Sequence, residues 1–272
     1  MKRRWVNVIA FVGAVAIAAV FAVPIVWIVV SSLKSPLEVT RIPPTLAFTP
    51  TTVNYHNLVF ARGAGRAIMN SAVVSILTVL ACGALGTLAG YGLARLRGVA
   101  SRQLAFYFLS TRFAPPVAAV LPLFVLFRTA GLLDTKAALI IAYTAFNMPL
   151  VIWMMRQFFM ELPPDLEEAA LIDGASQATA FLKVSLPLVA PGLAATAVLV
   201  FIFSWNEFLY ALILSGGTLR TLPVMSASFA TDRLVLWGEL SAAAVISFAP
   251  VAVFAVILQR YLLRGLTFGA IK

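Results

Sequence analysis

Carboxylates are concentrated in one short stretch of this sequence. Five of the ten acidic residues fall within thirteen positions, at Glu161, Asp165, Glu167, Glu168 and Asp173. The whole chain carries a net charge of +10, so this stretch is an acidic island in a basic protein. Acidic side chains on a short amphipathic segment suit docking onto a partner protein, and we expect this stretch to bind one.

The sequence around these acids predicts two short helices. Pro163-Pro164 begins the first helix, and acids in its opening turns suit the positive end of the helix dipole. Gly174, after Asp173, ends it, because glycine accepts the left-handed conformation of a helix cap. Ser176 can cap the second helix. The predicted product is a helix-turn-helix with an acidic rim and an apolar side.

An ordinary amphipathic loop lying on the membrane surface is the alternative interpretation. A helix that lies on anionic lipid is usually basic, whereas this one is acidic. The charge therefore favours docking onto a partner.

The rest of the chain must be placed in lipid. It is 62% hydrophobic and 11% charged, with a mean hydropathy of +0.99, whereas soluble domains are about a quarter charged. Strand-like alternation is absent, so the spans must be helices. We predict an all-α polytopic membrane protein, a single transmembrane domain over 1–272, with a cytoplasmic helix-turn-helix at 160–187 and about six transmembrane helices at 8–30, 67–93, 103–126, 137–159, 188–214 and 240–263.

Three details refine this topology. The first apolar run is too long for a cleaved signal, so we expect it to be a retained span. Basic residues favour the segments that share a side with the N-terminus, which predicts that both termini are cytoplasmic. Pro115-Pro116 and Pro122 interrupt the third span, where a kink or break is expected.

Fixed spacings in the acidic loop resemble the EAA loop of ABC importer permeases. Three residues separate Ala170 from Gly174, and nine separate Gly174 from Val184, as in that motif. Val184 replaces the more usual isoleucine. The positions that match or fit the motif are Glu168, Ala169, Ala170, Asp173, Gly174, Ala175, Phe181, Val184, Leu186 and Pro187.

The resemblance covers nearly the whole chain and is to the smaller, second permease of maltose-type carbohydrate importers. Further matching segments are Ser31–Lys34, Asn54-Tyr55, Asn70-Ser71, Ala89–Arg95, Trp205–Phe208 and the tail Gly265–Lys272, in which Phe268 stands where a small residue is common. The resemblance implies a bacterial inner-membrane subunit that imports a sugar, polyol or related solute. Its implied partners are a second permease, two ATPase subunits, an extracytoplasmic binding protein and the lipid bilayer.

The resemblance also implies roles within the loop. Glu168 would contact the ATPase, Ala169 and Ala170 would allow close approach, and Gly174 would make the turn. Leu186 and Pro187 would join the loop to span five. The chain has no G-x-x-x-x-G-K-[ST] phosphate loop, so we expect no enzyme activity and no cofactor here, with ATP and Mg bound by the partner ATPase.

Polar residues within the apolar segments are candidates for a substrate pathway. Arg112 is costly in hydrocarbon, which points to an aqueous path, a polar partner or snorkelling. Trp205, Asn206 and Glu207 could hold a sugar, or could form an interfacial aromatic belt with a helix contact. Weaker candidates are Asn70, Ser71, Ser75 and Asn147, and Gly86-x-x-x-Gly90 indicates close helix packing.

Several other classes fit less well. With one cysteine, Cys82, and one histidine, His56, we expect no metal site and no Cys-His catalytic site. A membrane-embedded enzyme is disfavoured because the sequence places no His/Cys/Asp cluster and no Ser-His pair within a predicted span. No basic-aromatic stripe of the kind that binds nucleic acid is present. A stand-alone secondary transporter would need ionisable relays or paired repeats, and an ABC permease for a non-carbohydrate solute remains a third alternative.

Overall fold

The computed structural model describes residues 2–96, 98–231 and 235–268, with side chains from Ala10 to Val256 inside those ranges. The described chain is helical and has no strand beyond an isolated bridge between Ala230 and Val235. The predicted C-terminal tail is described only as backbone as far as Phe268, and residues 269–272 lie outside the described part.

Spanning helices dominate the described chain, which confirms the predicted all-α membrane fold. Five helices are long and apolar enough to cross a bilayer, and a bent pair makes a sixth span if its two helices are counted as one. The five spans are formed by α1 (Lys2–Ser32), α4 (Ala64–Arg95), α7 (Lys136–Met160), α10 (Leu186–Trp205) and α13 (Trp237–Phe268). The bent pair is α5 (Val99–Thr111) with α6 (Pro116–Thr129).

The third span breaks where the sequence predicted, with a bend of 83° between α5 and α6. Pro115 and Pro116 set the break, since a residue before proline avoids the helical conformation and proline suits the first helical position. Pro122 lies inside α6 without ending it, so that part of the predicted interruption is absent.

The fifth span differs from the predicted 188–214. It starts earlier, because α9 (Gln177–Ala180) continues through the π-helical turn η2 (Phe181–Ser185) into α10. It also ends earlier, at Trp205, and a separate helix α11 (Leu209–Leu214) follows. The Glu207 carboxylate accepts the backbone N–H groups of Tyr210 and Ala211 and so begins α11 as a new helix.

The remaining elements are short: α2 (Pro36–Val39), α3 (Val53–His56), η1 (Asn57–Ala61), α8 (Asp165–Ile172) and α12 (Leu222–Ala227). The chain forms two compact units. One combines residues up to 65 with 225–249, and the other combines 66–224 with the chain from 250 onward. In the first unit, buried Asn54 donates to the carbonyls of Ser32 and Lys34, and Arg62 pairs with Glu239 at 3.1 Å.

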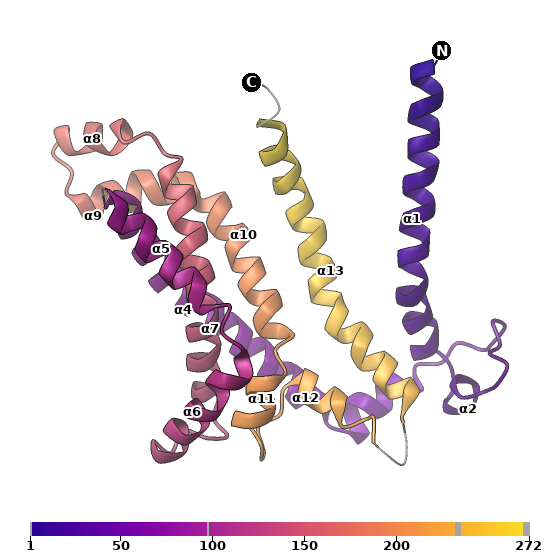
Figure 1. Cartoon of the computed structure of the whole chain (residues 1–272). Helices are drawn as coiled ribbons and strands as arrows, with labels where there is room; N and C mark the ends of the chain where they lie inside the picture. Colours follow the sequence, from indigo (N-terminus) through magenta and orange to yellow (C-terminus); the bar gives the residue numbers. More distant parts are fainter. Residues whose placement is uncertain (1, 97, 232–234, 269–272) are drawn as a thin grey trace. The chain divides into compact units, whose positions relative to one another are not determined.

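In the second unit, α7 is the central helix. It packs on α5, α10 and α11, and its buried side chains include Leu139, Tyr143, Met155 and Phe159. Figure 1 shows α8 and α9 at one end of this unit, with α11 and the end of α6 at the other. The acidic loop and the α5–α6 break are therefore positioned by one scaffold but at different levels of it.

Two glycines bring α4 directly against α7. A Cβ on Gly86 would lie 2.6 Å from Val151 Cγ1, and one on Gly90 would lie 2.9 Å from the backbone N of Arg156. Any side chain at these positions would push the helices apart. The close packing indicated by the Gly86-x-x-x-Gly90 spacing is thus present in the structure.

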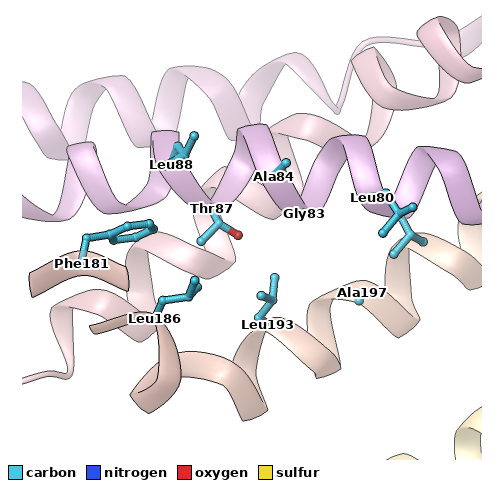
Figure 2. A pocket seen from close by; sticks show the side chains of 10 residues that line it. Leu80, Gly83, Ala84, Thr87, Leu88, Phe181, Leu186, Leu193 and Ala197 are labelled. Atoms are coloured by element: carbon cyan, nitrogen blue, oxygen red, sulfur yellow. The ribbon is translucent and has the colours of Figure 1, made fainter. Parts of the chain in front are cut away.

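An apolar cavity of about 500 Å³ lies between α4 and the η2–α10 segment (Figure 2). Its walls include Leu80, Leu88, Leu193 and Phe181, and the buried Thr87 hydroxyl has no hydrogen-bond partner among the described residues. Such a wall fits the hydrocarbon surroundings that the composition requires.

Candidate functional site

The acidic loop folds as the predicted helix-turn-helix. Helix α8 carries Asp165, Glu167 and Glu168 in its first turn, and Gly174 has a φ of +87° just beyond its end. Space around Gly174 is open, so the backbone conformation alone calls for glycine there. The Ser176 hydroxyl accepts the N–H of Thr179 and caps α9.

Adjacent acids in α8 have opposite environments. Glu168 is exposed, whereas the side chain of Glu167 is only 12% exposed. Glu167 accepts from Arg95 Nε at 2.8 Å and Nη2 at 2.5 Å, from the Tyr91 hydroxyl at 3.1 Å and from the Ser185 hydroxyl. One carboxylate therefore joins α4, α8 and η2.

The electrostatics of this joint favour the charged carboxylate. Partial burial opposes ionisation of Glu167, but hydrogen bonds from Arg95 and Ser185 and the positive charge of Arg95 hold its pKa below the ordinary value. Arg95 also donates to the Phe159 carbonyl at the end of α7. The ion pair consequently ties the loop to two spans at once.

An aromatic cluster backs the joint. The Tyr91 ring lies 5.2 Å from Phe159 and 4.7 Å from Phe181, and the Phe159 and Phe181 rings are 6.0 Å apart. Phe181 is 8% exposed. Of the loop residues singled out in the sequence, Phe181 and the partly buried Leu186 thus anchor the second helix inward.

The opposite face of the loop is open. Exposed residues on it are Asp165, Leu166, Glu168, Ala169, Ile172, Asp173 and Gly174, while Ala170, Ala175 and Val184 are half-buried and Pro187 is exposed. The apolar side chain of Ile172 is 85% exposed, although acidic residues surround it in the sequence. Carboxylates around an apolar centre are the makeup of a docking surface.

A second polar site lies at the α5–α6 break. The Arg112 guanidinium lies between the rings of Phe146 and Phe203, with its centre 4.7 and 4.6 Å from theirs. Its Nη1 donates to the Phe146 carbonyl at 3.0 Å and to Asn147 Oδ1 at 3.3 Å. Among the described residues no carboxylate lies within ion-pair distance of Arg112.

Asn147 extends this site to α10, since its Nδ2 donates to the Tyr143 carbonyl and to the Ser204 hydroxyl. Two predicted pathway residues, Arg112 and Asn147, are therefore brought together. Glu207 is not their partner, because its carboxylate caps α11.

The other predicted pathway residues lie elsewhere. Trp205 is 5% exposed and stacks on Phe201 at 5.7 Å, whereas Asn206 is exposed and donates to the Ile202 carbonyl. Asn70 donates to the Arg220 carbonyl, and Ser71 accepts the N–H of Leu222. The last two side chains attach the start of α4 to the first residue of α12 and to the segment just before it.

Sequence reasoning missed a third attachment, at Asp134. Its carboxylate accepts the backbone N–H groups of Gly217, Thr218 and Leu219, and it holds that segment against the α6–α7 loop. The ion pair between Glu167 and Arg95 was also not predicted. The sequence did indicate that Glu167 points inward, because adjacent helical residues lie about 100° apart and Glu168 shares the outward face with Ile172.

No group of three or more potential metal-binding side chains occurs in the searched, described part of the chain. The geometry instead offers a docking surface at one end and a charged, aromatic-lined break within the span region.

Comparison with known proteins supports a transport assignment. Residues 84–268 match the family described as binding-protein-dependent transport system inner membrane component. A probable ABC transporter permease of Sinorhizobium fredii is 41% identical over 94% of this chain and 92% of its own length. A trehalose transport system permease of Mycobacterium tuberculosis is 38% identical over 92% of each chain. In fold, the chain resembles a bacterial ABC transporter that imports alginate, with a TM-score of 0.71, 24% identity and coverage of 94% and 96%.

Proposed function

The chain belongs to the family of binding-protein-dependent transport system inner membrane components, and from that premise we propose that it forms one membrane half of an ATP-driven sugar importer. The trehalose permease to which it is similar, together with the resemblance to maltose-type permeases, supports a sugar, polyol or related solute as cargo. The acidic helix-turn-helix with its open outer face is the observation that carries the proposal.

In this proposal, α8 and α9 dock in a groove of a partner ATPase. Glu168 supplies the charged contact, Ala169 and Ala170 permit close approach, and exposed Ile172 supplies apolar area. Gly174 makes the turn that presents both helices. ATP and Mg are bound by that partner.

Force must then pass from the loop to the spans, and Glu167 gives it a route. Its bonds to Arg95 and Ser185 join α8 to the end of α4 and to η2, which continues into α10. Movement of the docked loop is thereby passed to both spans. ATP-driven closure has to favour one pathway conformation by several kcal/mol to switch populations cleanly.

The remaining partners follow from the same proposal. A second permease completes the pathway, two ATPase subunits dock from the cytoplasm and an extracytoplasmic binding protein delivers the solute. Both termini and the α8 end of the second unit face the cytoplasm. Arg112 and Asn147, at the α5–α6 break, border the pathway.

Reconstitution of the transporter with and without its ATPase subunits tests the class of protein. We expect solute uptake only with ATPase, binding protein and ATP present. Uptake that needs no ATPase would identify a secondary transporter instead.

Two variants test the docking surface. Glu168→Lys and Gly174→Val should each lower ATP-driven uptake by about tenfold or more while the protein still inserts in the membrane, since a reversed interface charge or a strained turn costs over 1 kcal/mol. Glu161→Lys is the matched control, because Glu161 is exposed but precedes α8. Normal coupled uptake in both loop variants would remove the proposed role.

A further inference from the structure

A second cavity, separate from both sites above, lies between α5 and α7. It measures about 670 Å³ and is lined by Val99, Arg102, Gln103, Ala105, Phe106, Trp153, Arg156, Gln157 and Met160. Two arginines, two amides and a tryptophan thus share one wall, and no acid is among the lining residues. This composition differs from that of the cavity in Figure 2, where Thr87 carries the one polar side chain among the lining residues.

Arg156 is the unexpected member of this wall. It is only 9% exposed, and its Nε donates to the Ser101 hydroxyl at 3.1 Å. Within the described ranges its two terminal nitrogens have no hydrogen-bond partner, and no carboxylate lies within 4 Å of them. Neither terminal nitrogen is among the buried atoms that lack a partner, so both are accessible and can meet an anion in the cavity that Arg156 lines.

A comparison with Arg95 shows that such compensation is available nearby. Arg95 lies at the same end of the unit and pairs with Glu167. Arg156 and the exposed Arg102 form no ion pair in the described chain, although the first acid of the acidic loop, Glu161, directly follows Met160. The cavity therefore retains two positive charges facing one space.

The level of the cavity along the helices identifies the kind of anion. Arg156 lies four residues before the end of α7 and Arg102 three residues after the start of α5, which places both within about 6 Å of a helix end. Because α7 is longer than the hydrocarbon core is thick, this level is near the boundary between hydrocarbon and headgroups, where tryptophan is enriched, and Trp153 lies about one turn deeper. Phe106 and Met160, 69% and 51% exposed, continue the wall with apolar surface suited to acyl chains.

We propose that this cavity binds the phosphodiester headgroup of an anionic phospholipid, with Arg156 and Arg102 contacting the phosphate, Gln103 and Gln157 contacting its polar substituent, and Phe106 and Met160 contacting the acyl chains. Basic pockets between transmembrane helices at the membrane surface bind such lipids in other proteins. The site does not depend on what the transporter carries.

Lipid titration of the full chain, purified with its copurifying subunits, tests the site. Native mass spectrometry would measure the apparent affinity for phosphatidylglycerol against phosphatidylcholine of identical acyl chains. We expect a preference for phosphatidylglycerol that Arg102→Gln weakens about fivefold, the effect of one surface arginine on an anionic lipid. Arg156→Gln should weaken it at least as much.

Arg128→Gln is the matched control, since Arg128 is an exposed arginine in the last turn of α6, away from the cavity. It should leave the lipid preference unchanged. Because Arg102 is exposed, Arg102→Gln keeps the test valid even if Arg156→Gln fails to fold. Equal binding of both lipids, or equal losses from Arg128→Gln and Arg102→Gln, would overturn the proposal.

Competition with inorganic phosphate distinguishes a lipid headgroup from a free phosphate ion as the ligand of this cavity. Phosphate alone should not displace the lipid at millimolar concentration, because it lacks the acyl chains that Phe106 and Met160 contact. Full displacement by phosphate would reassign the cavity to a soluble anion. A carboxylate of another subunit found against Arg156 in a structure of the complex would likewise replace the lipid.

Discussion

The α8 end of the second unit and the α5–α6 break treat a partly buried arginine in opposite ways. At the α8 end, Arg95 forms an ion pair with Glu167. The same carboxylate also accepts hydrogen bonds from the hydroxyls of Tyr91 and Ser185. At the break, Arg112 is held by two aromatic rings, a carbonyl and an amide, with no carboxylate near it in the described chain. The first arginine is held by an ion pair, whereas the second is held by neutral groups only among the described residues.

This difference teaches where the molecule is expected to be stiff. A charge pair with satisfied neighbours resists separation, which suits a point through which force passes. An arginine stacked between rings keeps unused donors in a span, which suits a passage for polar solute. Four experiments can break or sharpen this contrast.

Charge reversal at the joint should give the largest effect. Glu167→Lys places two cations side by side, and we expect ATP-driven uptake to fall by about tenfold or more. Arg95→Glu combined with Glu167→Lys should recover part of that loss, because the swapped pair can reform. Uptake and ATPase rates in proteoliposomes provide the measurement. Glu168→Lys should gain nothing from Arg95→Glu, and any rescue there would contradict the joint.

Neutralising each arginine should separate the two regions by stability. Arg95→Met strands the Glu167 carboxylate and should cost about 2–3 kcal/mol, whereas Arg112→Met strands no carboxylate and should cost about 1 kcal/mol or less. Thermal unfolding in detergent would rank the two variants. Equal losses would mean that Arg112 has an acidic partner after all.

The glycine contact tests whether the joint depends on the α4–α7 interface. Gly90→Ala should cost about 1–3 kcal/mol, because its Cβ would meet the backbone of α7. Gly92→Ala, with nothing within 4 Å of the new Cβ, should instead stabilise α4 by about 0.5–1 kcal/mol. The rate of amide hydrogen exchange around Arg95 should rise in Gly90→Ala only. An unchanged exchange rate in Gly90→Ala would mean that the Arg95–Glu167 contact does not depend on the α4–α7 interface.

Acid should produce the smallest and most selective change. The pKa of Glu167 is lowered in the folded state, so its contribution is fully present above the ordinary carboxyl pKa of about 4.3 and is lost as pH falls through the lower folded value. Hydrogen exchange of α8 and α9 should therefore increase on acidification below about pH 4. The α5–α6 break should respond less, and a larger response there would reverse the comparison.

The helical membrane fold and the two helices of the acidic loop could be predicted from the sequence, because both depend on local sequence patterns. Hydropathy located the spans, Gly174 and Ser176 set the turn and the second helix, and Pro115-Pro116 set the break. These signals lie within a few residues of the structure that they determine.

Tertiary partners were out of reach of the same reasoning. Glu167 and Arg95 are 72 positions apart, and Asp134 is 83 from Gly217, so nothing local marks either contact. The end of span five was wrong for a related reason. Glu207 looks like a polar group within a long apolar run, but by accepting two backbone N–H groups it ends one helix and begins another.

The Asp134 contact has a practical consequence. Its carboxylate recognises mainly the backbone of residues 217–219, so the outer surface of that segment is free of most side-chain demands. Gly217 is the exception, since a Cβ there would lie 2.5 Å from Asp134 Oδ2, whereas Gly216 has open space around it. A cysteine introduced at Gly216 could therefore carry a fluorescent reporter on a segment whose backbone remains fastened beneath it.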